Sequence, residues 1–311
     1  MKRAVVFAAA LCAIAAEEHR EAGRVEDYDC KHRECVLLRD GASQPIQQLL
    51  PVREGDIVEI REGQAAVVLW LAGKEVVVCG DPRKPPQNTA HCDAGPKFTV
   101  PRATLSVART PDAIAAFFRS FGSWLSRLQE EPERVVSGDV PRPGESIDIP
   151  LLPEAPGVAL IAEGRRTFVL PWRGCRPALV GLYRGNHAAG DDDPVMTLSG
   201  QSGAQVRLPD VSLYEGEYHV VMSCEADKNV SARRDVTVLK TADLPLVPDF
   251  SRVALPPGLL AVARAGWLAA NNGSQWRLEA YLQIDGVPDR YGSARVLREA
   301  LARGSAPPGA K

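Results

Sequence analysis

Residues 63–79 read GQAAVVLWLAGKEVVVC, two short apolar runs separated by Gly73-Lys74. β-branched and aromatic side chains dominate both runs, and the glycine between them is typical of a turn. Within residues 65–71 both alternate faces are apolar, which is the pattern of a strand covered on both sides. The sequence therefore predicts two strands and a turn, with the first strand at the centre of a sheet.

Further short β-branched runs lie on either side of this pair. Residues 36–38 and 57–60 are the clearest, and Asp40-Gly41, Gly55-Asp56 and Glu62-Gly63 punctuate them as turns. Short runs at close spacing, bounded by glycine and aspartate, predict strands joined by tight turns. We expect one compact β module over residues 30–105.

Part of this module resembles a known family. The runs VREGDIVEI (52–60), GQAAVVL (63–69) and GKEVVV (73–78) are similar to the periplasmic β domain of FecR-type regulators. The resemblance covers about residues 36–80 and implies a small β-roll. FecR-type proteins relay signals, so the resemblance also implies an alternative function, a periplasmic signal-sensing subunit that acts through a membrane partner.

Residues 110–131 predict an amphipathic helix. Thr110 is a good N-cap, and Pro111 suits the first helical position. Apolar residues recur at helical spacing along one stripe: Ile114, Phe117, Phe118, Phe121, Trp124, Leu125 and Leu128. We expect this stripe to be buried against residues 36–105 or against the next module, the alternative being a face for a membrane surface or a ligand. The proline-rich residues 132–156 predict a stiff linker.

Residues 157–240 predict a second β module. Seven short strands are expected, separated by turns, and this pattern is typical of an immunoglobulin-like β-sandwich. The expected strands are residues 158–161, 167–170, 178–183, 195–198, 205–208, 218–223 and 235–239. In residues 213–220 a glycine precedes a Tyr-x-Val strand, as happens late in many such domains.

Residues 252–304 predict a short helical module. Leu259–Ala270 and Ser293–Ala302 are rich in alanine, leucine and arginine. Trp267, Trp276 and Tyr281 are expected to form its small core. The pattern resembles a tetratricopeptide repeat, although one unit does not make an array. Residues 305–311 are expected to be a tail. The fold class is thus mainly β with helical additions.

The N-terminus predicts export. A basic start at Lys2-Arg3 is followed by apolar residues 4–15 ending in Ala13-Ile14-Ala15, the form of a cleaved signal peptide. The expected signal peptide covers residues 1–15 and contains Cys12. Its removal leaves six cysteines in a compartment that permits disulfides. We therefore expect a periplasmic or secreted protein with no transmembrane span in its mature chain.

The six remaining cysteines are Cys30, Cys35, Cys79, Cys92, Cys175 and Cys224. Six cysteines allow fifteen pairings, and modularity favours local bonds, which join neighbours along this order. The alternative is a zinc site from the first four cysteines with His32 or His91. Structural zinc usually uses tighter Cys-x-x-Cys spacing than the chain offers.

Catalytic motifs are weak in this chain. Residues 200–204 (GQSGA) lack the final glycine of a nucleophile elbow. Asp191-Asp192-Asp193 could bind calcium, but three adjacent acids in a loop are usually only solvated, and His187 and His219 have no matching ligand pattern. We expect no enzyme, no catalytic residue, no cofactor and no metal.

Composition limits the class of partner. The formal net charge is −2, with 24% charged and 45% hydrophobic residues, which gives no electrostatic footprint for nucleic acid. The sequence thus predicts a non-catalytic envelope adaptor or binding protein for another envelope protein or a glycan. The alternatives are the signal-sensing subunit named above and an enzyme with an unrecognised site.

Overall fold

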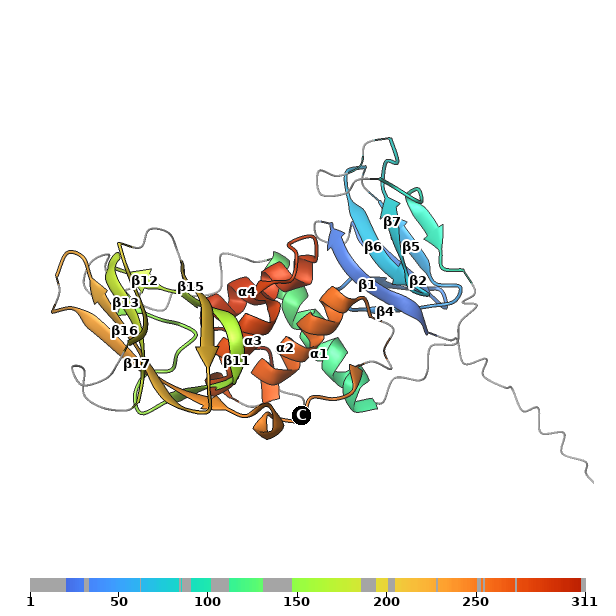
Figure 1. Cartoon of the computed structure of the whole chain (residues 1–311). Coiled ribbons are helices and arrows are strands. Elements are labelled where there is room, and N and C mark those ends of the chain that lie inside the picture. Colours follow the sequence, from blue (N-terminus) through green and yellow to red (C-terminus); the bar gives the residue numbers. More distant parts are fainter. Residues whose placement is uncertain are drawn as a thin grey trace, which may run out of the picture.

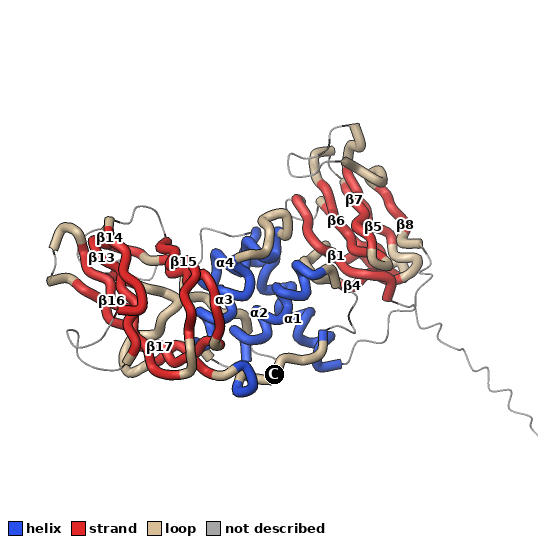
Figure 2. The backbone as a smooth tube through the Cα atoms, in the orientation of Figure 1, coloured by secondary structure: helices blue, strands red, loops and turns tan. Residues whose placement is uncertain are grey.

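In a computed structural model, three units follow one another along the molecule: a β-roll, a helical bundle and a β-sandwich (Figures 1 and 2). The structure describes residues 21–30, 34–61, 63–83, 85, 91–101, 112–130, 147–185, 194–200, 205–227, 229–250, 253, 255–271 and 273–308. The fold is mainly β with helical additions, as predicted. The expected signal peptide lies outside the described residues. Among the described helices, none is long and apolar enough to cross a membrane.

The β-roll consists of two four-stranded sheets. The first has the order β4 (Pro51–Arg53), β1 (Glu21–Asp29), β6 (Ala66–Leu71) and β7 (Lys74–Cys79). The second has the order β3 (Ala42–Pro45), β2 (Cys35–Arg39), β5 (Ile57–Ile60) and β8 (Lys97–Thr99). Their inner faces share one apolar core that includes Val25, Leu37, Val58, Val67 and Leu69.

The central strand prediction is confirmed, because β6 pairs with β1 on one side and β7 on the other. The expected module boundary at residue 30 is too late. Strand β1 precedes it and lies inside the first sheet, between β4 and β6. Arg24 and Glu26 are buried in this strand. Strands are predicted from alternating apolar residues, and these two charged residues interrupt that alternation.

The sandwich has the strand order β10 (Val158–Ala162), β17 (Ser231–Leu239), β16 (Gly216–Cys224), β13 (Pro177–Arg184) and β14 (Pro194–Ser199) in its main sheet. Strands β11 (Gly164–Pro171) and β15 (Gln205–Leu213) form a second sheet. All seven expected strands are present. The hydroxyl of Tyr218 accepts a hydrogen bond from the Tyr214 amide at 3.1 Å, the tyrosine corner typical of immunoglobulin-like sandwiches.

The end of the expected linker is part of the sandwich. Ile147–Asp148 forms β9, which pairs with β12 (Arg173–Gly174). Ile149, Leu151 and Leu152 are buried in the same core. Apolar residues between the prolines therefore fold onto the module, which corrects the prediction for residues 147–156. Residues 131–146 lie outside the described part of the chain.

The helical bundle draws on two distant parts of the sequence. Helix α1 (Asp112–Glu130) packs on α2 (Pro257–Asn271) and α4 (Gly292–Ala302). Helix α3 (Arg277–Asp285), which follows the short 3-10 turn Ser274–Trp276, packs on α2 and α4. The expected C-terminal module of residues 252–304 therefore also includes the amphipathic helix. Pro307 of the expected tail is buried, and residues 309–311 are not described.

The apolar stripe of α1 is buried, as predicted, but against a different surface from the one expected. Phe117 packs edge-on against Trp267 of α2, with ring centroids 5.1 Å apart, and Phe250 contacts both rings. Phe121 lies over Gly266, where an added Cβ would come within 2.4 Å of its ring. The stripe thus packs chiefly on the C-terminal helices.

A neighbouring face of α1 holds the β-roll. The hydroxyl of Ser126 accepts a hydrogen bond from the Gln48 amide at 3.1 Å. A Cβ at Gly122 would lie 2.2 Å from the Gln48 carbonyl oxygen, so only glycine permits this approach. The guanidinium of Arg24 lies 4.4 Å from the centre of the Phe118 ring, a cation–π contact at the same junction.

One buried carboxylate joins the bundle to the sandwich. Glu279 of α3 is 2% exposed and accepts hydrogen bonds from the Ala162 amide at 2.9 Å and the Arg166 guanidinium at 2.8 Å. A buried charge needs such partners to be tolerated. Both β modules are therefore fixed to the helices by specific polar contacts.

We predict that Phe121→Ala lowers the free energy of unfolding by about 3–5 kcal/mol, because truncating a fully buried aromatic removes apolar contacts and leaves a cavity. Phe121 is 0% exposed. Leu246→Ala is the control, since Leu246 is 95% exposed, and it should change stability by less than about 0.5 kcal/mol. Urea unfolding of both variants checks this, and equal effects would show that the stripe is not structural.

Candidate functional site

A cleft of about 570 Å³ lies between the outer face of the first roll sheet and the start of α4. Strands β1, β6 and β7 form one wall, and residues 289–295 form the other. The lining residues are Glu26, Asp27, Tyr28, Asp29, Ala66, Val68, Glu75, Val77, His91, Asp289, Arg290, Gly292 and Arg295. The cleft therefore lies between two modules, a common position for binding sites.

The lining is strongly acidic. It carries five carboxylates and two arginines, with one histidine at the edge. Alongside the charges, Ala66, Val68 and Val77 form an apolar strip on the outer face of the sheet. The cleft thus combines this apolar strip, called the apolar floor below, with more negative than positive side chains.

Glu26 owes its position to a β-bulge. Val25 pairs with Leu69 and Asp27 with Val68, so Glu26 is an extra residue in β1 with no partner in β6. Bulges of this kind change the direction of a side chain and recur near functional sites. Glu26 is 3% exposed, lines the cleft, and its Oε2 atom has no hydrogen-bond partner.

The environment of Glu26 disfavours its charged form. Burial, followed by the nearby charges of Glu75 and Asp27, raises its pKa from an ordinary 4.5 to about 7, against the attraction of Arg290. The folded chain thus holds this proton more tightly than the unfolded chain. Folding becomes less favourable as the pH rises from about 4.5 to about 7. A carboxyl group in a cleft with so strongly shifted a pKa is a candidate binding residue.

Asp27 lies at the N-terminus of α4. Burial raises its pKa to about 6, although hydrogen bonds to the Tyr28 and Gly292 backbones and the charge of Arg295 act in the opposite direction. A helix N-terminus favours a carboxylate. A Cβ at Gly292 would lie 2.3 Å from Asp27 Oδ1, so the carboxylate would have to move to make room for a side chain there. This contact holds the two walls of the cleft together.

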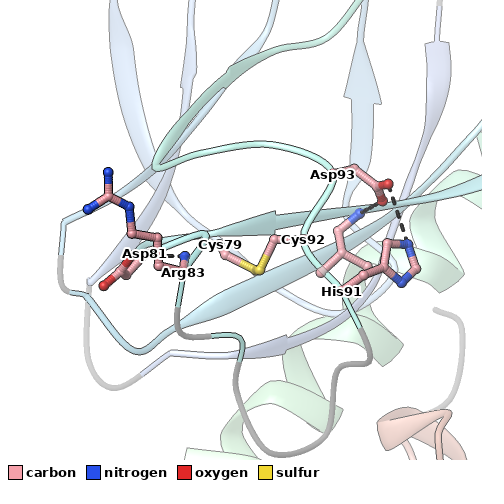
Figure 3. Close-up of a disulfide and its surroundings, with 7 residues drawn as sticks. Cys79, Asp81, Arg83, His91, Cys92 and Asp93 are labelled. Atoms are coloured by element: carbon pink, nitrogen blue, oxygen red, sulfur yellow. Dashed lines mark hydrogen bonds and ion pairs between the residues drawn. A yellow bond between two sulfur atoms is a disulfide. The ribbon is translucent and has the colours of Figure 1, made fainter.

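The Cys79–Cys92 disulfide lies next to His91 (Figure 3), which lines the cleft. Its Cα atoms are 5.8 Å apart. Beside it, the Val77 amide donates to Asp93 Oδ2 at 2.8 Å, and His91 Nε2 lies 3.4 Å from Asp93 Oδ1 (Figure 3). The bond therefore fixes the chain on which His91 reaches the cleft.

The other cysteines are bonded in the local pairs expected from the sequence. Cys30 joins Cys35 and Cys175 joins Cys224, with Cα distances of 5.9 and 5.7 Å. Bonded cysteines offer no thiolates to a metal, which overturns the zinc alternative. Across the described residues, no group of three or more His, Cys, Asp or Glu side chains could hold a metal ion. Disulfides of this kind form in oxidising compartments outside the cytosol.

The remaining motifs do not converge on a site. His219 is buried, hydrogen-bonded through Nδ1 to the Gly185 carbonyl at 2.9 Å and stacked on Tyr183, which is a structural role. His187, residues 191–193 and residues 201–204 lie outside the described residues.

A second, more polar cleft of about 410 Å³ separates the sandwich from α3 and α4. The Arg207 guanidinium donates two hydrogen bonds, of 2.8 and 2.9 Å, to the Asp285 carboxylate across this cleft. The charges at this cleft are thus already paired within the chain.

Sequence reasoning missed the acidic site, because Glu26 and Asp27 lie before the expected module boundary. The alternation of strand β1 is broken by its bulge and by charged residues at buried positions. The usable signal was Val25 and Tyr28, two apolar residues flanking a pair of acids.

No protein-family model and no curated protein sequence matches this chain. A solved structure with some likeness is the Bacteroides ovatus mixed-linkage glucan utilization locus protein SGBP-B in complex with mixed-linkage heptasaccharide. It is 11% identical, the match covers 77% of this chain and 70% of that chain, and the TM-score is 0.17. At this score the likeness supports no conclusion about fold or ligand.

We predict that Gly292→Ala destabilises the protein by about 1–3 kcal/mol, because the new methyl group displaces the partly buried Asp27 carboxylate from its hydrogen bond to the Gly292 backbone. Gly286→Ala is the control, since a Cβ there meets nothing within 4 Å. Thermal unfolding of both variants checks the difference. Equal stability would mean that the two walls are not joined through Asp27.

We also predict unequal losses from removing two disulfides. The Cys175–Cys224 bond spans 49 residues and the Cys30–Cys35 bond spans 5. In the chain-entropy model their removal by paired Cys→Ala substitutions costs about 4 and about 2 kcal/mol. Urea unfolding of the two double variants measures both losses, and a larger loss for the short loop would contradict the model.

Proposed function

We propose that this chain is an exported, non-catalytic envelope adaptor or binding protein that recognises another protein or a glycan through the acidic cleft. The observation that carries the proposal is the Oε2 atom of Glu26, buried at the cleft without a hydrogen-bond partner. Leaving such an atom unpaired costs free energy, and a ligand that donates to it would recover that cost.

The arrangement of the modules supports this proposal. The helical bundle fixes the roll through Gln48 and Ser126 and the sandwich through Glu279 and Arg166. A cleft between firmly held modules presents its groups in fixed positions, which lowers the entropy cost of binding.

A FecR-like signal-sensing subunit is the alternative that shares the same cleft. In that case occupancy of the cleft would be reported to a membrane partner. A membrane protein recovered as the bound partner, with an envelope ligand required for the contact, would favour sensing over a purely adaptor role.

An enzyme is the second alternative, and one observation favours it. Glu26, with its pKa raised to about 7, retains a proton near neutral pH, and Glu75 is close enough to contribute to that shift. Carboxyl groups whose pKa is raised in this way serve as acids and bases in catalysis. Turnover of envelope glycans that disappears in Glu26→Gln would support this reading, and binding without turnover would support the adaptor.

We predict that a photo-reactive benzoyl-phenylalanine in place of Arg295, an exposed residue of the cleft, crosslinks to an envelope protein or glycan in the exporting cell. The same group in place of Tyr214, which is 63% exposed on the sandwich, is the control and should give no such product. Gel shifts with mass spectrometry and glycan staining identify the product. Identical products at both positions, or none at Arg295, would contradict the proposal.

A further inference from the structure

We propose that the acidic cleft binds an extended basic side chain, lysine or arginine, of a partner protein, with its aliphatic stem on the apolar floor and its cationic head at Glu26 and Glu75. This inference rests on the proposed function and specifies the ligand of the same cleft.

The charge of the cleft favours a cation. Four carboxylates from the roll, those of Glu26, Asp27, Asp29 and Glu75, line it. Among the described residues, neither Glu26 nor Glu75 has an ion-pair partner within 4.0 Å. The Oε2 atom of Glu26 is buried and lacks any hydrogen-bond partner. An ammonium or guanidinium group supplies both a donor and a compensating charge.

The floor of the cleft favours an aliphatic stem over a sugar. Ala66, Val68 and Val77 lie on the outer face of the sheet, next to the acids. Lysine and arginine carry methylene chains that pack on such surfaces while the charged head reaches polar groups. Tyr28 is the aromatic residue among those that line the cleft, but it is 5% exposed and its side chain packs in the roll core. It therefore presents no open face on which a sugar ring could stack.

The chain already holds one cation at the mouth of the cleft. Arg290 is attracted by Glu26 and Glu75. Its guanidinium nevertheless lies 5.0 Å from the centre of the Tyr291 ring and donates to the Tyr291 hydroxyl at 3.3 Å. Arg290 therefore competes with an incoming cation without neutralising the acids. Removing Arg290 and removing Glu26 should act on affinity in opposite directions.

The test is calorimetric titration of the full mature chain at pH 8 with the blocked peptide acetyl-Gly-Ser-Lys-Ser-Gly-amide. The matched peptide has norleucine in place of lysine, which keeps the aliphatic stem and lacks the ammonium group. We expect the lysine peptide to bind at least about tenfold more tightly than the norleucine peptide. Spermidine is the third ligand, because it carries the same chemistry without a polypeptide, and it should bind more weakly than the lysine peptide.

The variants give opposite expected results. Glu26→Gln and Glu75→Gln should each weaken binding of the lysine peptide about tenfold or more, and Arg290→Ala should strengthen it several-fold. Glu217→Gln is the control, because it makes the same charge change at an exposed position of β16 in the sandwich and should leave affinity unchanged. Glu26→Gln removes a charge from a buried position, so this variant is expected to fold.

The affinity should also fall between pH 8 and pH 5.5, because protonation of Glu26 removes its charge. The other titratable or charged groups facing it are Asp27, Asp29, Glu75, His91, Asp289, Arg290 and Arg295. The drop should persist in His91→Gln and be reduced in Glu26→Gln, which separates the carboxylate from the imidazole.

Several results would overturn the inference. These are equal binding of the lysine and norleucine peptides, unchanged affinity in Glu26→Gln, or spermidine binding as tightly as the peptide, which would indicate a free amine as ligand. If one of these occurs while crosslinking from Arg295 still succeeds, the cleft remains a binding site with a different ligand. If crosslinking from Arg295 also fails, the proposed function fails with it.

Discussion

The packing of Phe121 on Gly266 is the contact on which the arrangement of this molecule depends. It joins a helix encoded at residues 112–130 to helices encoded after residue 257. Without a side chain at Gly266 the aromatic ring reaches the backbone of α2. Phe117 stacks on Phe121 and in turn contacts the rings of Phe250 and Trp267. Close packing of this kind tolerates little change in volume, so it fixes the arrangement of the helices. The positions of the two β modules then follow from their contacts with these helices.

The acidic cleft follows from that arrangement. The roll contacts α1 through Gln48 and Arg24, and this contact sets its outer sheet face opposite the start of α4. Asp27 then meets the Gly292 backbone across the junction. Four of the five carboxylates of the cleft thus belong to the roll, whereas Asp289 and the arginines belong to the loop before α4 and to α4 itself. Neither module contains the site alone.

The sequence was informative where one physical pattern dominated a segment. Alternation at residues 65–71 and the helical stripe from Ile114 to Leu128 predicted β6 and α1, and cysteine spacing predicted the disulfide pairs. What it missed depends on long-range contacts. Strand β1 is buried together with Arg24 and Glu26, whose charges are acceptable only because distant residues surround them. Likewise, no local pattern indicates that Phe121 packs on Gly266, more than a hundred residues away.

The split origin of the helical bundle has a consequence for how the protein is made. The sandwich is encoded between α1 and the C-terminal helices of the bundle. Helix α1 therefore leaves the ribosome well before α2, α3 and α4 have been made. At about 5–20 residues per second, synthesis of the intervening chain takes on the order of ten seconds. During that time Phe117, Phe118 and Phe121 have no α2 to cover them. The newly made chain therefore presents an exposed aromatic surface until α2 has been made, and such surfaces make incomplete chains prone to aggregation.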